Sequence, residues 1–177
     1  MRYSRTRLSI MDVADQLTIL GRSALAAALG IVIGLERESR GKAAGERTFA
    51  LLSLGAAAFV SIGGFLFPTS ADRIVQGIAA GVGFLGGGVI FRRETGVQGL
   101  TTAASAWAAA AIGVVAGLGA YLAATLATAL VLLILELDQI PFLRRLSERA
   151  ETAASANPRD RENHEHHRPR APHDRGP

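Results

Sequence analysis

Long apolar stretches alternate with short charged or turn-forming segments along most of the chain. Most of these stretches are free of charge, and each approaches the thickness of a bilayer's hydrocarbon core at about 1.5 Å of helix rise per residue. The pattern therefore predicts an all-α polytopic membrane protein, a bundle of about five transmembrane helices. The predicted spans cover residues 17–35, 49–67, 74–91, 100–118 and 120–137.

The run from 100 to 135 carries the strongest part of this prediction. It contains no Asp, Glu, Lys, Arg or His, and it is too long for one buried helix in a domain of this size. Gly117 and Gly119 offer a tight reversal that divides the run into two spans. The preceding charged loop, 92–99, is short enough to force an antiparallel hairpin between its neighbours.

Three polar regions flank the predicted 17–137 transmembrane domain. Residues 1–16 form a polar N-terminal segment, and 138–154 form a juxtamembrane segment that is either a helix on the membrane surface or a frayed helix end. Residues 155–177 have few apolar side chains, so we expect a disordered polar tail. Inside the first span, Arg22 either snorkels to the interface or is a functional intramembrane charge.

Composition narrows the function classes. The chain has 49% hydrophobic residues, a formal net charge of +4 and no cysteine. Without cysteine it forms no disulfide, thiolate metal site or reactive-thiol centre. Its basic residues lie beside apolar spans and in the tail, which indicates a lipid bilayer as partner and no nucleic acid.

The sequence contains no recognisable arrangement of catalytic residues. No nucleophile, base and orienting group stand at an interpretable spacing, so we expect no enzyme, no catalytic residue and no cofactor. His164, His166 and His167 could bind a divalent metal, but a solvated charged tail explains them better, and no metal site is predicted.

Orientation follows from the distribution of Lys and Arg among loops and span ends. One side of the membrane collects nine such residues and the other four. The richer side is predicted to be cytoplasmic. The chain is thus expected in the bacterial inner membrane with a periplasmic N-terminus and a cytoplasmic C-terminus, although the basic N-terminal segment opposes this.

The third span is rich in glycine. Gly81, Gly83 and Gly86 match the dinucleotide pattern G-x-G-x-x-G, but that pattern requires a strand-to-helix turn, and here it lies within an apolar span. On a helix the same glycines form two small-residue faces, which predicts close helix packing and a place in the middle of the bundle. The predicted packing residues are Gly77, Gly81, Gly83, Gly87 and Gly88. The same G-x-x-x-G spacing recurs at Gly30/Gly34 and Gly113/Gly117, where the glycine-rich composition makes chance a sufficient explanation.

Polar residues also gather where several spans end on the predicted cytoplasmic side. They could form an ion-pair and hydroxyl network, or a site for a small cation or a partner. Ordinary flanking charge is the alternative for any single member. The predicted cytoplasmic cluster consists of Glu36, Arg37, Glu38, Arg47, Thr48, Arg92, Thr101, Thr102 and Ser105.

Four of these stretches together resemble the MgtC/SapB family of bacterial inner-membrane proteins. Residues 34–38 (GLERE) and 45–48 (GERT) are similar to family motifs around the first loop. Residues 81–90 (GVGFLGGGVI) are similar to its GIGFLGAGVI, and 99–105 (GLTTAAS), followed by Trp107, to its GLTTAASLW. Two departures, Phe49 in place of the asparagine of the virulence-linked branch and a polar tail in place of a soluble C-terminal domain, favour a short, general member.

The resemblance implies a protein associated with adaptation to magnesium-poor or acidic conditions. It implies a regulator of membrane machinery, with ATP synthase as a possible partner. We therefore expect a non-enzymatic regulator that binds another membrane protein through its glycine-faced helices. The alternative is a small transporter or ion-conducting homo-oligomer for magnesium or protons, which would need a polar path across the membrane.

Overall fold

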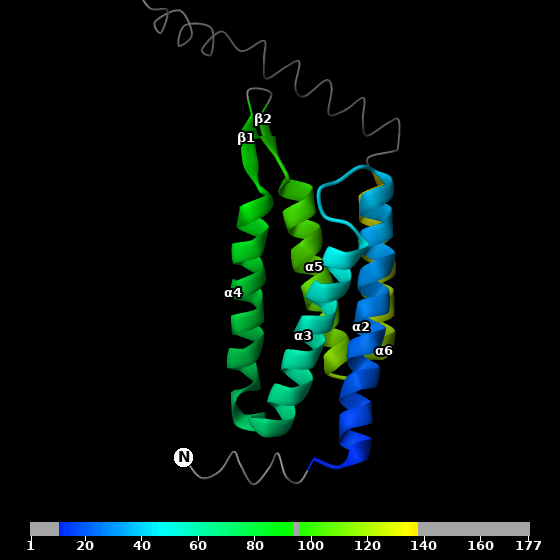
Figure 1. The fold of residues 1–177 in the computed structure, drawn as a ribbon, viewed down its shortest axis with the longest axis vertical. Helices are drawn as coiled ribbons and strands as arrows, with labels where there is room; N and C mark the ends of the chain where they lie inside the picture. The colour runs from blue at the N-terminus through cyan, green and yellow to red at the C-terminus, as the bar shows by residue number, and fades with distance from the viewer. Residues whose placement is uncertain (1–10, 94–95, 138–177) are drawn as a thin grey trace, which may run out of the picture. The chain divides into compact units, whose positions relative to one another are not determined.

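The computed structural model describes residues 11–93 and 96–137 and confirms an all-α bundle. The described residues form five α-helices that run alternately in opposite directions (Figure 1). These are α2 (Val13–Ser39), α3 (Glu46–Leu66), α4 (Ala71–Val89), α5 (Leu100–Gly117) and α6 (Tyr121–Glu136). The juxtamembrane segment 138–154, the tail 155–177 and most of the polar N-terminal segment lie outside the described residues.

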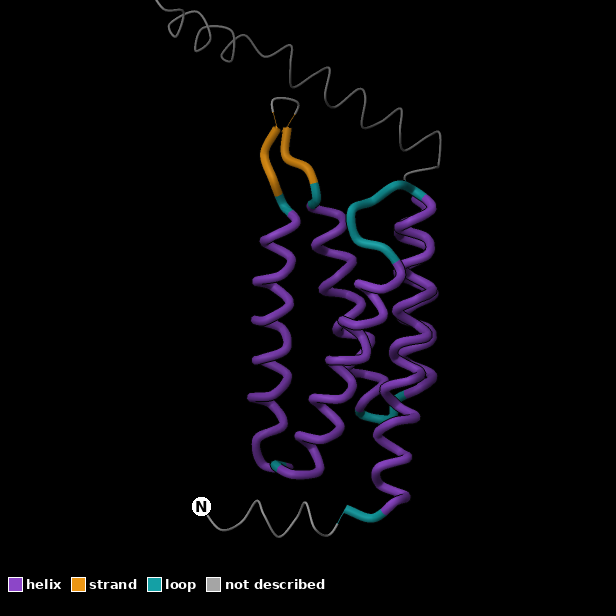
Figure 2. Tube along the Cα trace, viewed as in Figure 1, coloured by secondary structure: helices purple, strands orange, loops and turns teal. Residues whose placement is uncertain are grey.

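The loops gather at the two ends of the bundle (Figure 2). One end carries the α2–α3 loop and a two-stranded antiparallel hairpin of β1 (Phe91–Arg93) and β2 (Gly96–Gln98). The short charged loop predicted the antiparallel arrangement of α4 and α5, but not these two strands within the loop. We name this the hairpin end. The other end carries the 3₁₀ turn Pro68–Ser70 and the α5–α6 turn. The chain divides into two units, Met1–Ile134 and Leu135–Pro177, and the helices α2 to α5 belong to the first unit.

Three of the described helices, α2, α3 and α5, are long and apolar enough to cross a membrane, and α6 is a shorter apolar helix. Helix α4 does not meet the same standard, although a span was predicted there. It begins at Ala71 and ends at Val89, so it includes Asp72 and Arg73 and leaves Ile90 and Phe91 outside. The polar first turn lowers its mean hydropathy.

Large and small side chains are distributed as a lipid environment requires. Leucines and aromatic residues such as Leu51, Phe84 and Leu122 are exposed, whereas alanines such as Ala57, Ala109 and Ala116 are fully or almost fully buried. Exposing this apolar outer surface to water would cost much free energy, whereas contact with lipid tails, which are as apolar as leucine, does not. The small buried residues allow the helix backbones to approach closely.

Helix α3 lies between α2 and α5, and glycine makes both contacts possible. A Cβ atom added at Gly30 or Gly34 of α2 would collide with backbone atoms at the start of α3. A Cβ added at Gly113 or Gly117 of α5 would collide with backbone atoms of α3 near Ser53 and Ala57. The two G-x-x-x-G pairs that chance seemed to explain are therefore the close-packing sites of this bundle.

The predicted packing role of the α4 glycines within the bundle is wrong. A Cβ at Gly77, Gly81, Gly83, Gly87 or Gly88 would meet no other element within 4 Å. Helix α4 lies at the side of the bundle rather than in its middle, and it contacts α5 and α3 (Figure 1). It packs through Val82, which clusters with Ala56 and Ala110, and through Gly86, which lies against Ala103, whereas the five predicted packing glycines stay open.

Helix α5 is fixed to its neighbours by polar contacts to its backbone. Ser53 Oγ of α3 donates to the Ala109 carbonyl at 2.9 Å, and Ser61 Oγ donates to the Gly117 carbonyl at 2.8 Å. Arg22 Nη1 of α2 donates to the same Gly117 carbonyl at 2.9 Å. Gly117 ends α5, so these donors satisfy a carbonyl that has no partner within its own helix.

Candidate functional site

The polar residues of the hairpin end are organised around Arg37. The buried face of α2 includes Ala26, Gly30, Ile33 and Arg37, spaced by three or four residues. Arg37 is therefore carried inward by the same periodicity that buries the apolar residues, and it is only 2% exposed. A buried arginine at this position requires partners for its charge.

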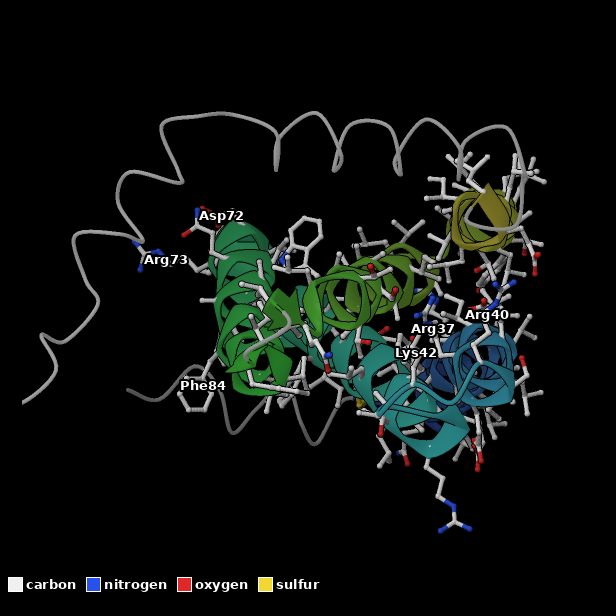
Figure 3. The ribbon with its side chains drawn as sticks, turned by 90° about the horizontal axis from the view of Figure 1, so that it is seen from above. Arg37, Arg40, Lys42, Asp72, Arg73 and Phe84 are labelled. Carbon is white, nitrogen blue, oxygen red and sulfur yellow. The ribbon has the colours of Figure 1, made fainter. Side chains whose placement is uncertain are left out.

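Arg37 has an ion-pair partner, but not every one of its N–H groups has an acceptor. Glu36 Oε2 lies 3.5 Å from Arg37 Nη1, and Glu36 Oε1 also pairs with Arg40 Nε one turn later. One carboxylate is thus shared by two guanidinium groups. Arg37 Nε is buried and has no hydrogen-bond partner among the described residues. Figure 3, seen from the hairpin end, shows Arg37, Arg40 and Lys42 beside one another.

The loop after α2 brings Lys42 back toward Arg37. The amide of Gly41 donates to the Glu38 carbonyl at 2.8 Å, and the amide of Lys42 donates to the Arg37 carbonyl at 3.1 Å. This is the helix-ending pattern that needs a left-handed residue, and Gly41 has a φ of 64°. The chain therefore reverses over the end of α2.

Arg37 and Lys42 line a cavity of about 620 Å³ at the hairpin end. Its other polar lining residues are Gln98, which ends the hairpin, and Thr101 and Thr102 in the first turn of α5. Apolar residues Val89, Phe91, Val97 and Leu100 complete much of the wall. None of the lining residues is a carboxylate, so the described cavity wall carries charge of one sign.

Part of the predicted cytoplasmic cluster lies elsewhere. Glu38, Arg47 and Thr48 line a separate cavity of about 440 Å³, which shares Lys42 with the first. There Glu38 Oε2 accepts from the Glu46 amide at 3.4 Å. Arg47 pairs with Glu46 at 3.7 Å, but its side chain is 94% exposed, and such pairs contribute little.

The structure therefore separates the predicted cluster into two groups. One group, Arg37, Thr101 and Thr102, lines the same cavity. Glu36 is not in that lining but forms an ion pair with Arg37. Ser105 donates to the Thr101 carbonyl at 2.6 Å, inside its own helix. Arg92 pairs with Val97 across the hairpin, and its side chain lies outside the described part of the structure.

Three nearby residues are absent from the predicted cluster: Arg40, Lys42 and Gln98. A sequence signal existed for Lys42, because a glycine just after a helix predicts the reversal that returns the next residue to the helix end. No sequence signal indicated Gln98, since its position in the cavity wall depends on how the hairpin is placed relative to the end of α2. Among the described residues no group of three or more His, Cys, Asp or Glu could hold a metal ion.

Comparison with known proteins gives consistent matches. The model of the MgtC family matches residues 24–141. Protein SrpB of Synechococcus elongatus is 40% identical over 154 residues, which covers 76% of this chain and 85% of SrpB. Protein MgtC of Salmonella typhimurium is 47% identical over 104 residues, or 59% of this chain. Protein MgtC of Brucella abortus is 42% identical over 105 residues.

Coverage differs between these relatives. The chain spans most of SrpB but only 45% of the Salmonella MgtC and 44% of the Brucella MgtC. No solved structure matches the chain. The matched region contains most of α2 and all of α3 to α6, including every described lining residue of the Arg37 cavity.

Proposed function

The chain belongs to the MgtC family, and on that premise we propose that it is a non-enzymatic membrane protein that regulates other membrane machinery. The regulated process is adaptation to low magnesium or acid, as the family resemblance implies. Regulation works through a transmembrane helix of the partner, which binds against α4. The bacterial inner membrane is the site of action.

One observation carries this proposal: the glycine face of α4 is open. An apolar groove of about 500 Å³ runs between α3 and α4, and its lining includes Gly77 and Gly81. These two glycines stand at the spacing that lets a neighbouring helix approach closely, and neither contacts another element of this chain. Leu51, Phe59 and Leu85 also line the groove and provide apolar contact area.

The arrangement of polar groups in the helices supports regulation over transport. Of the buried hydroxyls, Ser53 and Ser61 donate to α5 carbonyls, and Thr128 donates to a carbonyl of its own helix. Ser53 and Ser61 therefore join α3 to α5, and all three hydroxyls are already used by carbonyl groups. A transported ion would need a continuous row of hydrated polar groups.

The partner test uses the groove directly. A photoreactive p-benzoylphenylalanine at Phe59, which is 67% exposed in the groove, is activated in native membranes. We expect a crosslink to another membrane protein, probed first with antibodies to ATP synthase subunits. Gly81→Leu fills the groove, so it should abolish the crosslink and impair growth at low magnesium.

Gly21→Leu is the matched control, because Gly21 is also an open helical glycine but lies outside the groove. It should retain both the crosslink and growth. A crosslink only between copies of this chain would overturn the partner and favour an oligomer. Equal effects of Gly21→Leu and Gly81→Leu would remove the groove from the mechanism.

The transport alternative has its own test. Purified full-length chain in proteoliposomes is assayed for magnesium and proton flux against protein-free vesicles, with Glu36→Gln alongside. We expect flux no greater than that of the empty vesicles. Saturable flux that Glu36→Gln abolishes would replace the regulatory proposal with a transporter.

A further inference from the structure

The cavity at the hairpin end has the properties of an anion site. Its described lining contains two cationic side chains, Arg37 and Lys42, and no carboxylate. Glu36, which pairs with Arg37 and with Arg40, is not among the lining residues. Two cationic side chains on one cavity wall attract an anion, and a buried guanidinium is stabilised by each additional acceptor.

The unpartnered Nε of Arg37 is the most specific feature. The residue is 2% exposed, and its Nε–H has no acceptor among the described residues. Guanidinium groups bind phosphate oxygens strongly because several N–H donors are held in a fixed plane. Arg37 lines the cavity while leaving part of its donor capacity unused.

The start of α5 adds donors to the same cavity. Its N-cap is Gly99, which has no side chain to cap the helix, and its φ is 90°. The first amide groups of a helix have no partner within it and carry the positive end of the helix dipole. Leu100, Thr101 and Thr102, whose amides these are, all line the cavity. Phosphate groups bind at such helix starts.

We propose that this cavity binds a phosphate group between Arg37, Lys42 and the N-terminus of α5. The phosphate belongs either to a phospholipid headgroup or to a free phosphate. The apolar lining residues Phe91, Val97 and Leu100 are 43%, 55% and 57% exposed, so an acyl chain attached to the phosphate would have apolar surface beside the cavity. This site does not depend on the proposed function, because it lies outside the α3–α4 groove and its binding is measured on the purified chain without a partner.

The test compares three probes on the full-length chain in neutral detergent. Inorganic phosphate is tested by its effect on thermal unfolding, against chloride at equal ionic strength. Dioleoylphosphatidic acid is tested by retention in native mass spectrometry, against dioleoylglycerol, which lacks the phosphate. Preference for phosphatidic acid alone identifies a lipid headgroup, and stabilisation by inorganic phosphate identifies a free phosphate.

Variants connect binding to the cavity. Lys42→Gln removes an exposed charge without disturbing the buried face, and it should weaken binding about three- to tenfold. Lys42→Arg should restore it. Arg37→Gln should weaken binding by about tenfold or more. If the Arg37 variant does not fold, the binding of Lys42→Gln alone decides the test.

Arg47→Gln is the control, since it removes the same charge at the same end from a side chain outside this cavity. It should leave binding unchanged. Absence of binding by both phosphate probes would overturn the proposal. Equal weakening by Arg47→Gln and Lys42→Gln would also overturn it, because the effect would then be general surface electrostatics.

Discussion

At the scale of single residues, the carbonyl of Gly117 is a junction of three helices. It accepts from Ser61 of α3 and from Arg22 of α2. The sequence was compatible with Arg22 as a snorkelling side chain or as a functional charge. In the structure its guanidinium lies at the C-terminal end of α5, where the helix dipole favours a cation.

Arg22→Gln should therefore destabilise the bundle, because the amide is too short to reach the carbonyl and carries no charge. We expect a loss of about 1–2 kcal/mol in the free energy of unfolding. Denaturant titration in mild detergent micelles measures this loss. Arg47→Gln, a change at an exposed side chain, is the reference, and an equal effect of both variants would mean that Arg22 only snorkels.

At the scale of elements, close packing depends on where a glycine faces rather than on how many a helix contains. Helix α4 carries the most conspicuous glycine pattern, yet Gly81 contacts no other element. Gly113 of α5 lies against the backbone of Ser53, which has no freedom to move aside. The same substitution should have opposite consequences at these two positions.

Gly113→Ala should destabilise the bundle by about 1–3 kcal/mol, because the new methyl group overlaps the α3 backbone. Gly81→Ala should be neutral or stabilising by up to about 1 kcal/mol, since alanine favours a helix more than glycine does. Unfolding of the two variants under one set of detergent conditions gives the comparison. Equal destabilisation would show that α4 is packed against another surface even in the purified chain.

At the scale of the whole molecule, the distribution of basic residues predicts that the hairpin end faces the cytoplasm. The chain has no cysteine, so single cysteines report accessibility without a background. Ala43 and Thr69 are exposed residues in loops at opposite ends of the bundle. Each tolerates a small substitution because neither is buried.

Ala43→Cys should react with a membrane-impermeant maleimide only after the cells are opened, because positively charged loops remain in the cytoplasm. Thr69→Cys should react in intact cells. The reverse labelling pattern would place the Arg37 cavity on the periplasmic side. Labelling of both residues in intact cells would indicate two orientations.

The amino-acid sequence by itself determined the helical architecture. Charge-free runs, Pro68 and the glycine reversals act locally, so they predicted five helices and the antiparallel arrangement of α4 and α5 before any contact was known. Four short motifs in order also indicated the family, and the match over 24–141 confirms it.

Only the tertiary structure decided which of these residues meet. G-x-x-x-G spacing occurs in α2, α4 and α5, and nothing local distinguishes Gly30 and Gly113, which lie against α3, from Gly81, which lies open. The polar cluster divides for the same reason, since Arg37 lies on the buried face of α2 whereas Arg47 is exposed in the first turn of α3. Helix formation depends on neighbours along the chain, but packing depends on how each helix is rotated against the others.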